Sequence, residues 1–395
     1  MAEKIIIIIS SSRWDDLWTR KQRLANYFSQ KGFKVVYIEP PFTLGISREN
    51  LKSIILKVKN LSKKHLLINE NLLVISSPFL LPGTLCFCFI NFIYQIIFYR
   101  YINTRIKKVL SKRRVNNMVI INYLPYIPFV IKWLSRNNKI IYDVVDNFSE
   151  MKGFLVNSSL ISKLEAKLIS YTDICIVTNK DLFEKFKKKA KMISLIPNGV
   201  DFNHFNVDKE DLLEPDDLAI IPPPRVGFIG TIQYWLDYDL LYFLGEKLPF
   251  YSFIFIGPVS DEEDTGRITS FKNFFFLGKK DYRDLPSYLK YLDVLILPFK
   301  QTGIAKSASP LKLYEYLATG KPIVSTCITE VEGLNDLVYI ASDKDEFLKL
   351  INEAIGEKND IEKYNRRIRY AQQCDWQQRF KVIENLILKL YDSIK

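Results

Sequence analysis

The segment 303–326, which reads GIAKSASPLKLYEYLATGKPIVST, constrains the fold more than any other part of the chain. Ser309-Pro310 is typical of a helix start, with serine as the cap and proline at the first helical position. The helix over 311–318 should end at Gly320, and the apolar residues that follow begin a short buried strand. The sequence therefore predicts a loop, a helix, a glycine turn and a parallel strand in immediate succession.

The start of this helix has the chemistry of an anion site. Its first backbone N–H groups are unpaired and carry part of the helix dipole, so they attract phosphate. Lys306 and Lys312 flank that end, and Glu315 lies about one turn further along, where a carboxylate can accept hydrogen bonds from ribose hydroxyls. We predict that the helix holds both halves of a sugar nucleotide, although an ordinary helix with a solvated Lys and Glu would contain the same residues.

The run PLKLYEYLATGKPIV, residues 310–324, resembles the nucleotide-sugar helix of GT-B glycosyltransferases in the group 1, family 4-like branch. Within that branch it is nearest to divergent bacterial transferases that make surface polysaccharides. A Glu before such a glycine turn binds the donor ribose in the family, which implies this role for Glu315. The family pattern carries a second Glu eight positions earlier, where this chain has Ser307. The PNGVD turn at 197–201 resembles a motif that the family has between its two domains.

The resemblance also implies further donor contacts in the second half of the chain. The helix tip at Ser309, Pro310 and Leu311 would hold the diphosphate, together with Ser307, Lys306 and Lys312. The loop after the strand at 225–230, with Gly230 and Thr231, would lie against the donor phosphates, and the loop at Gly278 would hold the base through its backbone. Positive charge at the leaving diphosphate would make a divalent metal unnecessary, so we expect no metal and no cofactor.

The first half opens with a strand, a helix and a second strand. Residues 5–9 are five isoleucines, which is typical of a central parallel strand, and residues 35–39 form the next apolar run. Strand, helix, strand over this length is a βαβ unit, and the absence of GxGxxG disfavours a dinucleotide oxidoreductase. In the family, acceptor and donor meet at the first loop. Arg13 and Arg20 are the basic groups best placed there, unless both lie on the surface.

A later apolar strand of the first half delivers two carboxylates to the rim of the predicted sheet. Residues 140–142 precede Asp143 and Asp146, and related polysaccharide transferases show a YD-x-x-D motif here. An acceptor hydroxyl must lose its proton as it attacks, and a chain with two His points to a carboxylate as the base. We predict Asp146 as the base, with Asp143 as the second choice. The alternative is that both residues cap the strand and the following helix.

Charge divides the chain into unlike halves. Residues 1–200 hold 32 Lys and Arg against 13 Asp and Glu, a balance of +19, whereas residues 201–395 hold 24 against 31, a balance of −7. A basic half indicates an anionic partner such as a membrane surface. Nucleic-acid binding is disfavoured because few aromatic residues lie among the lysines of 181–191. Five Cys without a CxxC pair are typical of a reduced, cytoplasmic protein.

The aromatic segment 85–101 is followed by basic residues. At about 17 residues with two polar side chains, it is shorter than a spanning helix requires. It fits either a buried core helix or an interfacial helix on an anionic membrane.

These patterns lead to one hypothesis and two alternatives. We predict an α/β protein with two doubly wound, Rossmann-like domains across a cleft: an acceptor domain over 1–200, a nucleotide-sugar domain over 201–375, and a helix over 376–395 that crosses back to the first. The function would be transfer of sugar from a UDP- or GDP-sugar to a saccharide or lipid-linked acceptor, at the inner face of the membrane, for cell-surface polysaccharide. The alternatives are a nucleotide-sugar 2-epimerase and a non-catalytic sugar-nucleotide-binding protein of the same fold.

Overall fold

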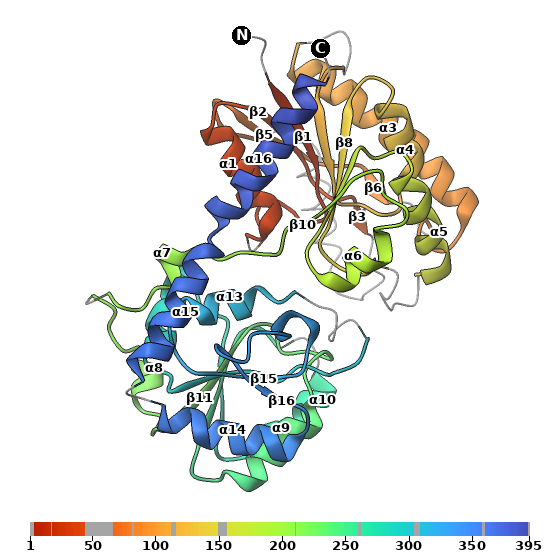
Figure 1. Ribbon diagram of the computed structural model, residues 1–395. Helices are drawn as coiled ribbons and strands as arrows, with labels where there is room; N and C mark the ends of the chain where they lie inside the picture. Colours follow the sequence, from red (N-terminus) through yellow and green to blue (C-terminus); the bar gives the residue numbers. More distant parts are fainter. Residues whose placement is uncertain are drawn as a thin grey trace. The chain divides into compact units, whose positions relative to one another are not determined.

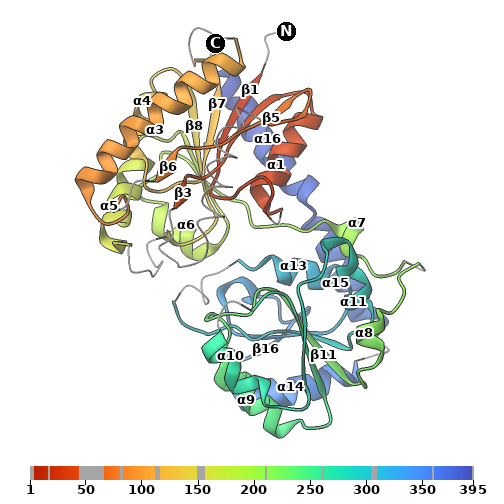
Figure 2. The ribbon, with the colours of Figure 1, turned by 180° about the vertical axis from the view of Figure 1, so that it is seen from behind.

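A computed structural model of the 395-residue chain describes ten stretches of it. These are residues 4–16, 18–43, 66–80, 83–111, 116–148, 156–209, 211–259, 262–303, 309–357 and 360–393. The chain forms two compact units: unit 1 contains Met1–Ile196 and Phe380–Lys395, and unit 2 contains Pro197–Arg379. Unit 2 is therefore a continuous segment, while unit 1 is built from both ends of the chain (Figures 1 and 2).

Unit 1 is built on an eight-stranded sheet whose order is β10-β9-β8-β7-β1-β2-β5-β4. Its strands are β1 Ile5–Ile9, β2 Lys34–Ile38, β4 Leu66–Asn69, β5 Leu72–Ile75, β7 Val119–Asn122, β8 Lys139–Val144, β9 Ile174–Val177 and β10 Ile193–Leu195. All pairings are parallel except β4 with β5. Two further short strands, β3 Phe42–Thr43 and β6 Phe79–Leu80, pair separately. The strand order reverses between β1 and β7, which is the switch point of a doubly wound fold.

The central strands of unit 1 are covered on both faces, which explains their unbroken apolar sequence. Helices α3 Cys88–Val109, α4 Pro128–Leu134 and α5 Ser158–Ile169 lie over one face, and α1 Arg20–Gln30 lies over the other (Figures 1 and 2). Helix α6, Lys180–Phe186, covers only the first part of the lysine-rich run 181–191. All five isoleucines of β1 are at most 1% exposed.

The last helix, α16 Trp376–Asp392, begins in unit 2 and continues in unit 1. Within unit 1 its Phe380 ring lies 5.5 Å from the ring of Tyr27, and the Tyr27 hydroxyl donates to Glu384 at 2.6 Å. The Tyr391 hydroxyl donates to the carbonyl of Ile5 at the start of β1. The far end of the sequence thus completes the layer beside α1.

Unit 2 contains a six-stranded, all-parallel sheet in the order β13-β12-β11-β14-β15-β16. Its strands are β11 Arg225–Ile229, β12 Ser252–Ile256, β13 Phe274–Gly278, β14 Val294–Leu297, β15 Ile323–Thr326 and β16 Tyr339–Ala341. Its helices are α7 Phe202–Phe205, α8 Asp216–Ala219, α9 Tyr238–Lys247, α10 Glu262–Thr269, α11 Leu285–Lys290, α13 Leu311–Leu317, α14 Lys344–Gly356 and α15 Ile361–Gln373. This is the dinucleotide-fold strand order, with its switch point between β11 and β14.

The predicted α/β class with two doubly wound, Rossmann-like units is confirmed. In open sheets of this kind, ligands bind outside the carboxyl ends of the strands at the switch point. That rule directs attention to the loops after β11 in unit 2 and after β1 and β7 in unit 1.

Candidate active site

Helix α13 of unit 2 lies where the sequence predicted it, but it starts differently. Pro310 is the residue before the helix, and no side chain caps the first turn, so the predictions of Ser309 as cap and Pro310 as first helical residue are wrong. Ser309 is instead nearly buried, and the Asn198 side chain donates to its carbonyl at 2.9 Å. Asn198 belongs to the PNGVD turn, which therefore fixes the entrance to α13.

Two charged residues of α13 form an ion pair. Lys312 Nζ lies 2.6 Å from Glu315 Oε2, and both side chains are less than one-fifth exposed. The pair lies beside the loop that follows β11, since a Cβ placed on Gly230 would come 3.8 Å from Lys312 Cε. Three of the predicted donor residues, Glu315, Lys312 and Gly230, are thus brought together at the switch point of the sheet. Leu311 opens the same helix, and Thr231 follows Gly230.

The glycine loops after β11, β12 and β13 touch one another. Gly257 has φ +149°, and a Cβ there would lie 2.0 Å from the Gly230 carbonyl oxygen, so only glycine allows this approach. The Gly257 N–H donates to the Gly278 carbonyl at 2.9 Å, which places the predicted base-binding loop next to them. The three loops together form a backbone floor at the carboxyl edge of unit 2.

A tyrosine that the sequence analysis did not single out joins α13 to this floor. The hydroxyl of fully buried Tyr316 accepts a hydrogen bond at 2.7 Å from the N–H of Ile229, the residue before Gly230. On the same helix, the Tyr314 hydroxyl donates to Glu330. Burial raises the pKa of Glu330, and hydrogen bonds from Tyr314 and Ser309 oppose that shift. The sequence pattern marks Tyr316 only as an apolar position of the helix.

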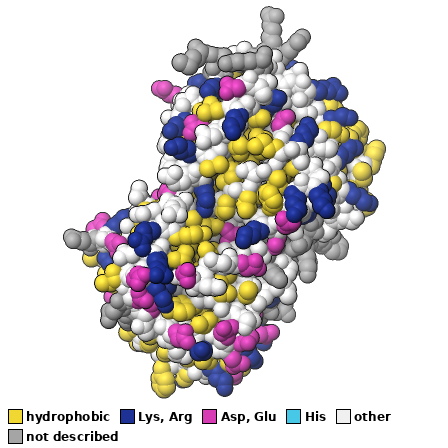
Figure 3. All heavy atoms as spheres, viewed as in Figure 1, with side chains coloured by type: hydrophobic (Ala, Val, Ile, Leu, Met, Phe, Trp, Pro, Cys, Tyr) yellow, Lys and Arg dark blue, Asp and Glu magenta, His cyan; other side chains and the backbone are white. Residues whose placement is uncertain are grey.

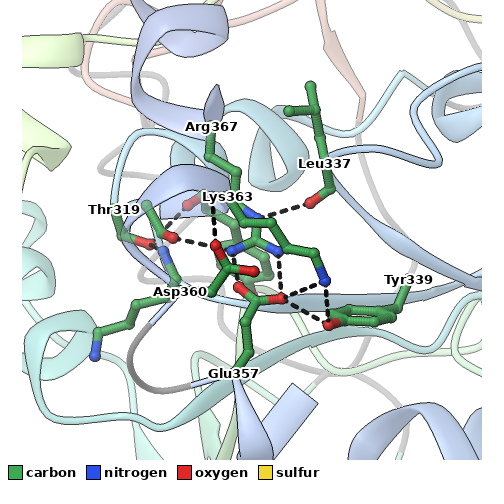
Figure 4. A network of polar contacts seen from close by, with 10 residues as sticks. Thr319, Leu337, Tyr339, Glu357, Asp360, Lys363 and Arg367 are labelled. Atoms are coloured by element: carbon green, nitrogen blue, oxygen red, sulfur yellow. Dashed lines mark hydrogen bonds and ion pairs between the residues drawn. The ribbon is translucent and has the colours of Figure 1, made fainter. Parts of the chain in front are cut away.

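A buried ionic network supports the far end of α13 (Figure 4). Arg367 of α15 is 1% exposed, and its guanidinium donates to the Leu337 carbonyl at 2.7 Å and to the Gly320 carbonyl at 3.2 Å. Glu357 pairs with Arg367 and accepts from the Tyr339 hydroxyl at 2.7 Å. Gly320 has φ +72° and ends the turn after α13. The network therefore holds the glycine turn that the sequence predicted between the helix and β15.

The two predicted carboxylates of unit 1 differ in their exposure to solvent: Asp143 is buried and Asp146 is exposed. Asp143 is fully buried, and its Oδ2 accepts from Arg20 Nε at 2.8 Å and from the Tyr123 hydroxyl at 2.7 Å. Arg20 is 1% exposed and also donates to the Ile196 carbonyl at 2.9 Å. The two residues form a buried pair that spans the inside of the unit. Arg20 therefore lies neither on the surface nor where it could contact an acceptor. Asp143 is likewise shielded from solvent.

Asp146 remains at the rim, beyond the end of β8, and solvent reaches it. The surrounding protein nevertheless raises the pKa of Asp146 through partial desolvation, and the positive charge of Lys21 opposes the shift. A carboxyl with a raised pKa that still meets solvent is suited to accept a proton. Arg13 lies in the loop after β1, where its N–H donates to Asp16 Oδ2 at 2.8 Å and its carbonyl accepts from Gln22 at 2.7 Å.

Lys21 is the residue of this rim that the sequence analysis missed. It is 8% exposed, and its ammonium donates to the Ser12 hydroxyl at 3.2 Å and lies 5.6 Å from the centre of the Tyr123 ring. Burial lowers the pKa of Lys21, and the charges of Asp146 and Asp143 oppose that shift. The available signal was its place beside Arg20 at the start of α1, after the loop of the first strand.

Lys306 and Ser307 lie outside the described residues, so their predicted donor contacts stay predictions. Among the described residues, no group of three or more His, Cys, Asp or Glu side chains is arranged to hold a metal ion. Within that same part of the chain, no helix combines the length and the hydrophobicity needed to span a membrane. The aromatic segment 85–101 falls largely within α3, six of whose side chains are buried.

Part of unit 2 matches a known protein family. Residues 223–357, which include β11, α13 and β15, match the family model of glycosyl transferases group 1. A Bacillus subtilis (strain 168) protein named as a teichuronic acid biosynthesis glycosyltransferase, TuaH, is 24% identical over 268 residues. That match covers 62% of this chain and 66% of the relative, slightly less than two thirds of its length.

Solved structures resemble the whole chain at low sequence identity. A sucrose-phosphate synthase from Thermosynechococcus elongatus has a TM-score of 0.68 at 13% identity, covering 99% of this chain and 100% of the other. An E. coli trehalose-6-phosphate protein bound with UDP-2-fluoro glucose gives 0.68 at 13%, covering 98% and 99%. Anabaena HepE in complex with UDP and glucose gives 0.64 at 14%, covering 98% and 99%. The chain thus has the GT-B fold of these solved structures, and its residues 223–357 are similar to the glycosyl transferases group 1.

Proposed function

We propose that this glycosyltransferase moves a sugar from a UDP- or GDP-sugar to a saccharide or lipid-linked saccharide during synthesis of a cell-surface polysaccharide. The observation that carries the proposal is the Lys312–Glu315 pair beside Gly230 at the switch point of unit 2. The teichuronic acid relative supports the polysaccharide class, and the UDP complexes of two similar structures support a nucleotide-sugar donor.

The donor chemistry follows from the two charges. The Glu315 carboxylate accepts hydrogen bonds from the ribose hydroxyls, and the Lys312 ammonium neutralises the diphosphate as it leaves. The backbone of the Gly230 and Gly278 loops approaches the phosphates and the base without side chains in the way. With Lys312, and with Lys306 in its predicted role, the site supplies positive charge without a metal, and the nucleotide sugar is a substrate rather than a cofactor.

The acceptor chemistry is assigned to unit 1. The acceptor oxygen forms a bond to the anomeric carbon of the sugar, and the bond from that carbon to the diphosphate breaks. Asp146 takes the proton of the acceptor hydroxyl, and Lys21 stabilises the carboxylate form of Asp146 before the reaction. Arg13 lies in the loop after β1 at the same edge and is kept as an acceptor-side group.

Binding of nucleoside diphosphates tests the donor assignment. UDP and GDP are titrated into the full chain by calorimetry, and Glu315→Ala should weaken binding of the preferred nucleotide at least about tenfold, since hydrogen bonds to a charged group contribute about 1.5–3 kcal/mol. Glu353→Ala is the matched control, because Glu353 also pairs with a lysine on a helix of unit 2. Unchanged affinity in Glu315→Ala, or no binding of either nucleotide, would reject the assignment.

We further propose a peripheral position at the inner, cytoplasmic face of the membrane, held by the basic first half of the chain. Figure 3 shows many of the acidic side chains of the visible face on unit 2, in keeping with the balances of +19 and −7 of the two halves. Pelleting with liposomes should require anionic lipid and should weaken as salt rises. Equal pelleting with neutral lipid, or none, counts against this position.

A further inference from the structure

A cavity of about 280 Å³ lies within unit 1, separate from the residues assigned to the donor. It is lined mainly by apolar side chains, among them Leu85, Leu124, Pro125, Phe148 and Val156, and also by Ser11. Small-molecule sites in proteins are typically concave and mostly apolar, with a few polar groups. A saccharide would find few hydrogen-bond partners on such walls, whereas a hydrocarbon chain gives up no hydrogen bonds to water when it enters.

The cavity lies at the switch point of the unit 1 sheet. Ser11 follows β1, and Leu124 and Pro125 follow β7, which are the two strands between which the strand order reverses. Ligands of open α/β sheets bind at this place. The cavity therefore lies at the position where proteins with such sheets bind their ligands.

The polar rim of the site continues directly into the cavity. The N–H of Phe148 donates to the Asp146 carbonyl at 3.0 Å, so a cavity wall lies two residues from the proposed base. On the other side, Ser12 accepts a hydrogen bond from Lys21 and is the neighbour of Ser11. A molecule with a hydroxyl at Asp146 and an apolar chain beyond it would meet both surfaces in turn.

Exposed aromatic side chains follow the cavity-lining residue Leu85 closely in the chain. Leu85 accepts a hydrogen bond through its carbonyl from the Asn157 N–H at 2.9 Å, which joins the segment before α3 to the segment before α5. Phe87 and Phe89, two and four residues after Leu85, are 61% and 73% exposed. Exposed aromatic side chains next to an apolar cavity fit an occupant that is longer than the cavity and partly embedded in lipid.

We propose that this cavity binds the apolar chain of a lipid-linked saccharide acceptor, an inference that rests on the proposed function and names the substrate class of its acceptor. An apolar cavity of about 150 Å³ accommodates benzene, so 280 Å³ holds about ten carbons. The first carbons beyond the head group enter the cavity, and the head group stays at the rim with Asp146 and Lys21.

A series of n-alkyl glucosides tests the proposal without any knowledge of the donor. Methyl, butyl, hexyl and octyl glucoside are titrated into the full-length protein below their micelle concentrations. Affinity should rise two- to fourfold for each added methylene, since a buried methylene contributes about 0.8 kcal/mol. Val156→Phe, at a half-buried position of the wall, should remove this chain-length dependence. Val382→Phe on α16 is the matched control, because Val382 is exposed and lies outside the cavity.

The outcomes separate this inference from the proposed function. Chain-length-dependent binding that Val156→Phe removes and Val382→Phe retains supports the cavity. No chain-length dependence overturns it, and the UDP and GDP titration then decides the donor function by itself. Chain-length dependence that survives Val156→Phe but is lost in Phe89→Ser also overturns the cavity, because the chain would then lie on the exposed aromatic surface. Circular dichroism of each variant verifies that it is folded.

Discussion

The ammonium nitrogen of Lys312 lies 2.6 Å from Glu315 Oε2, three residues further along α13, with both side chains largely buried. In the free protein the two charges neutralise each other. Under the proposed function, the donor phosphate would accept from the lysine and the ribose hydroxyls would donate to the glutamate. The pair thus places two opposite charges beside Gly230, at the carboxyl end of β11.

Lys312→Met should weaken UDP or GDP binding by about ten- to a hundredfold, because a charged hydrogen bond to phosphate contributes about 1.5–3 kcal/mol. Lys349→Met removes the lysine of the Lys349–Glu353 pair and should leave affinity unchanged. The double variant Lys312→Met with Glu315→Ala should lose less binding free energy than the sum of the losses in the two single variants, since the two residues interact. Calorimetric titration measures all three, and strict additivity would show that the pair does not act as a unit.

Asp146→Asn should keep nucleotide affinity and lower turnover by about a hundredfold or more, because general-base catalysis contributes roughly 10²–10⁴ to the rate. The measurement is sugar transfer under single-turnover conditions with the donor found by titration. Asp392→Asn, at an exposed position near the end of α16, serves as the control. Turnover of Asp146→Asn at the rate of the unaltered protein would exclude Asp146 as the base.

Lys21→Gln should move the acidic limb of the pH–rate profile to higher pH. The charge of Lys21 lowers the pKa of Asp146, so its removal raises that pKa, and the carboxylate then protonates at a higher pH as the solution is acidified. Asp143, Arg20 and Asp16 also face Lys21 and remain in the variant. A lower maximal rate with an unchanged acidic limb of the pH–rate profile would mean that Lys21 supports the structure only.

Asp143→Asn should destabilise the protein by about 3–5 kcal/mol, because it leaves the buried guanidinium of Arg20 without its counter-charge. Urea unfolding followed by circular dichroism measures the change in the free energy of unfolding. The double variant Arg20→Met with Asp143→Leu should recover part of the loss, since no uncompensated charge stays buried. A small effect of Asp143→Asn on stability, together with a large one on turnover, would return Asp143 to the catalytic candidates.

Glu357 should make the stability of the protein sensitive to acid. Burial alone would raise its pKa, but the hydrogen bonds and charge of Arg367, together with the Tyr339 hydrogen bond and the Lys363 charge, outweigh burial, and the pKa lies below the ordinary value of 4.5. Stability from this group is therefore present above about pH 4.5 and is lost as pH falls through the lower, folded-state pKa. Glu357→Gln should be less stable than the unaltered protein at pH 7, and the difference should shrink toward pH 3. A constant difference across this range would contradict the sign of the shift.

The sequence predicts the local elements well because their signals are local. The isoleucine run of β1 and the glycine turn after α13 are visible within a few residues, and both occur where expected. The first turn of α13 was mispredicted because the fixing contact comes from Asn198, 111 residues away. Strand β4, antiparallel at the sheet edge, has exposed leucines and no pattern that separates it from a loop.

The candidate site shows the same contrast between local contacts, which the sequence predicts, and long-range contacts, which it does not. Glu315 and Lys312 share one helix, so their spacing alone predicts that they meet. Arg20 and Asp143 are 123 positions apart, and only the tertiary structure, which brings the start of α1 within reach of Asp143, turns two apparent rim residues into a buried pair. Lys21 could not be chosen over Arg20 from the sequence, because one position of helix rotation decides which side chain enters the core and which meets Asp146.

The continuous segment 197–379 that forms unit 2 is inserted between the two pieces of unit 1. If unit 2 binds the donor, as proposed, the matching unit of a related transferase would be grafted as a single cassette, with one junction on each side. A gene cut after residue 196, by contrast, would deprive unit 1 of the α16 turns that pack on Tyr27 and the start of β1. Engineering of donor specificity should exchange the middle of the gene and leave both ends untouched.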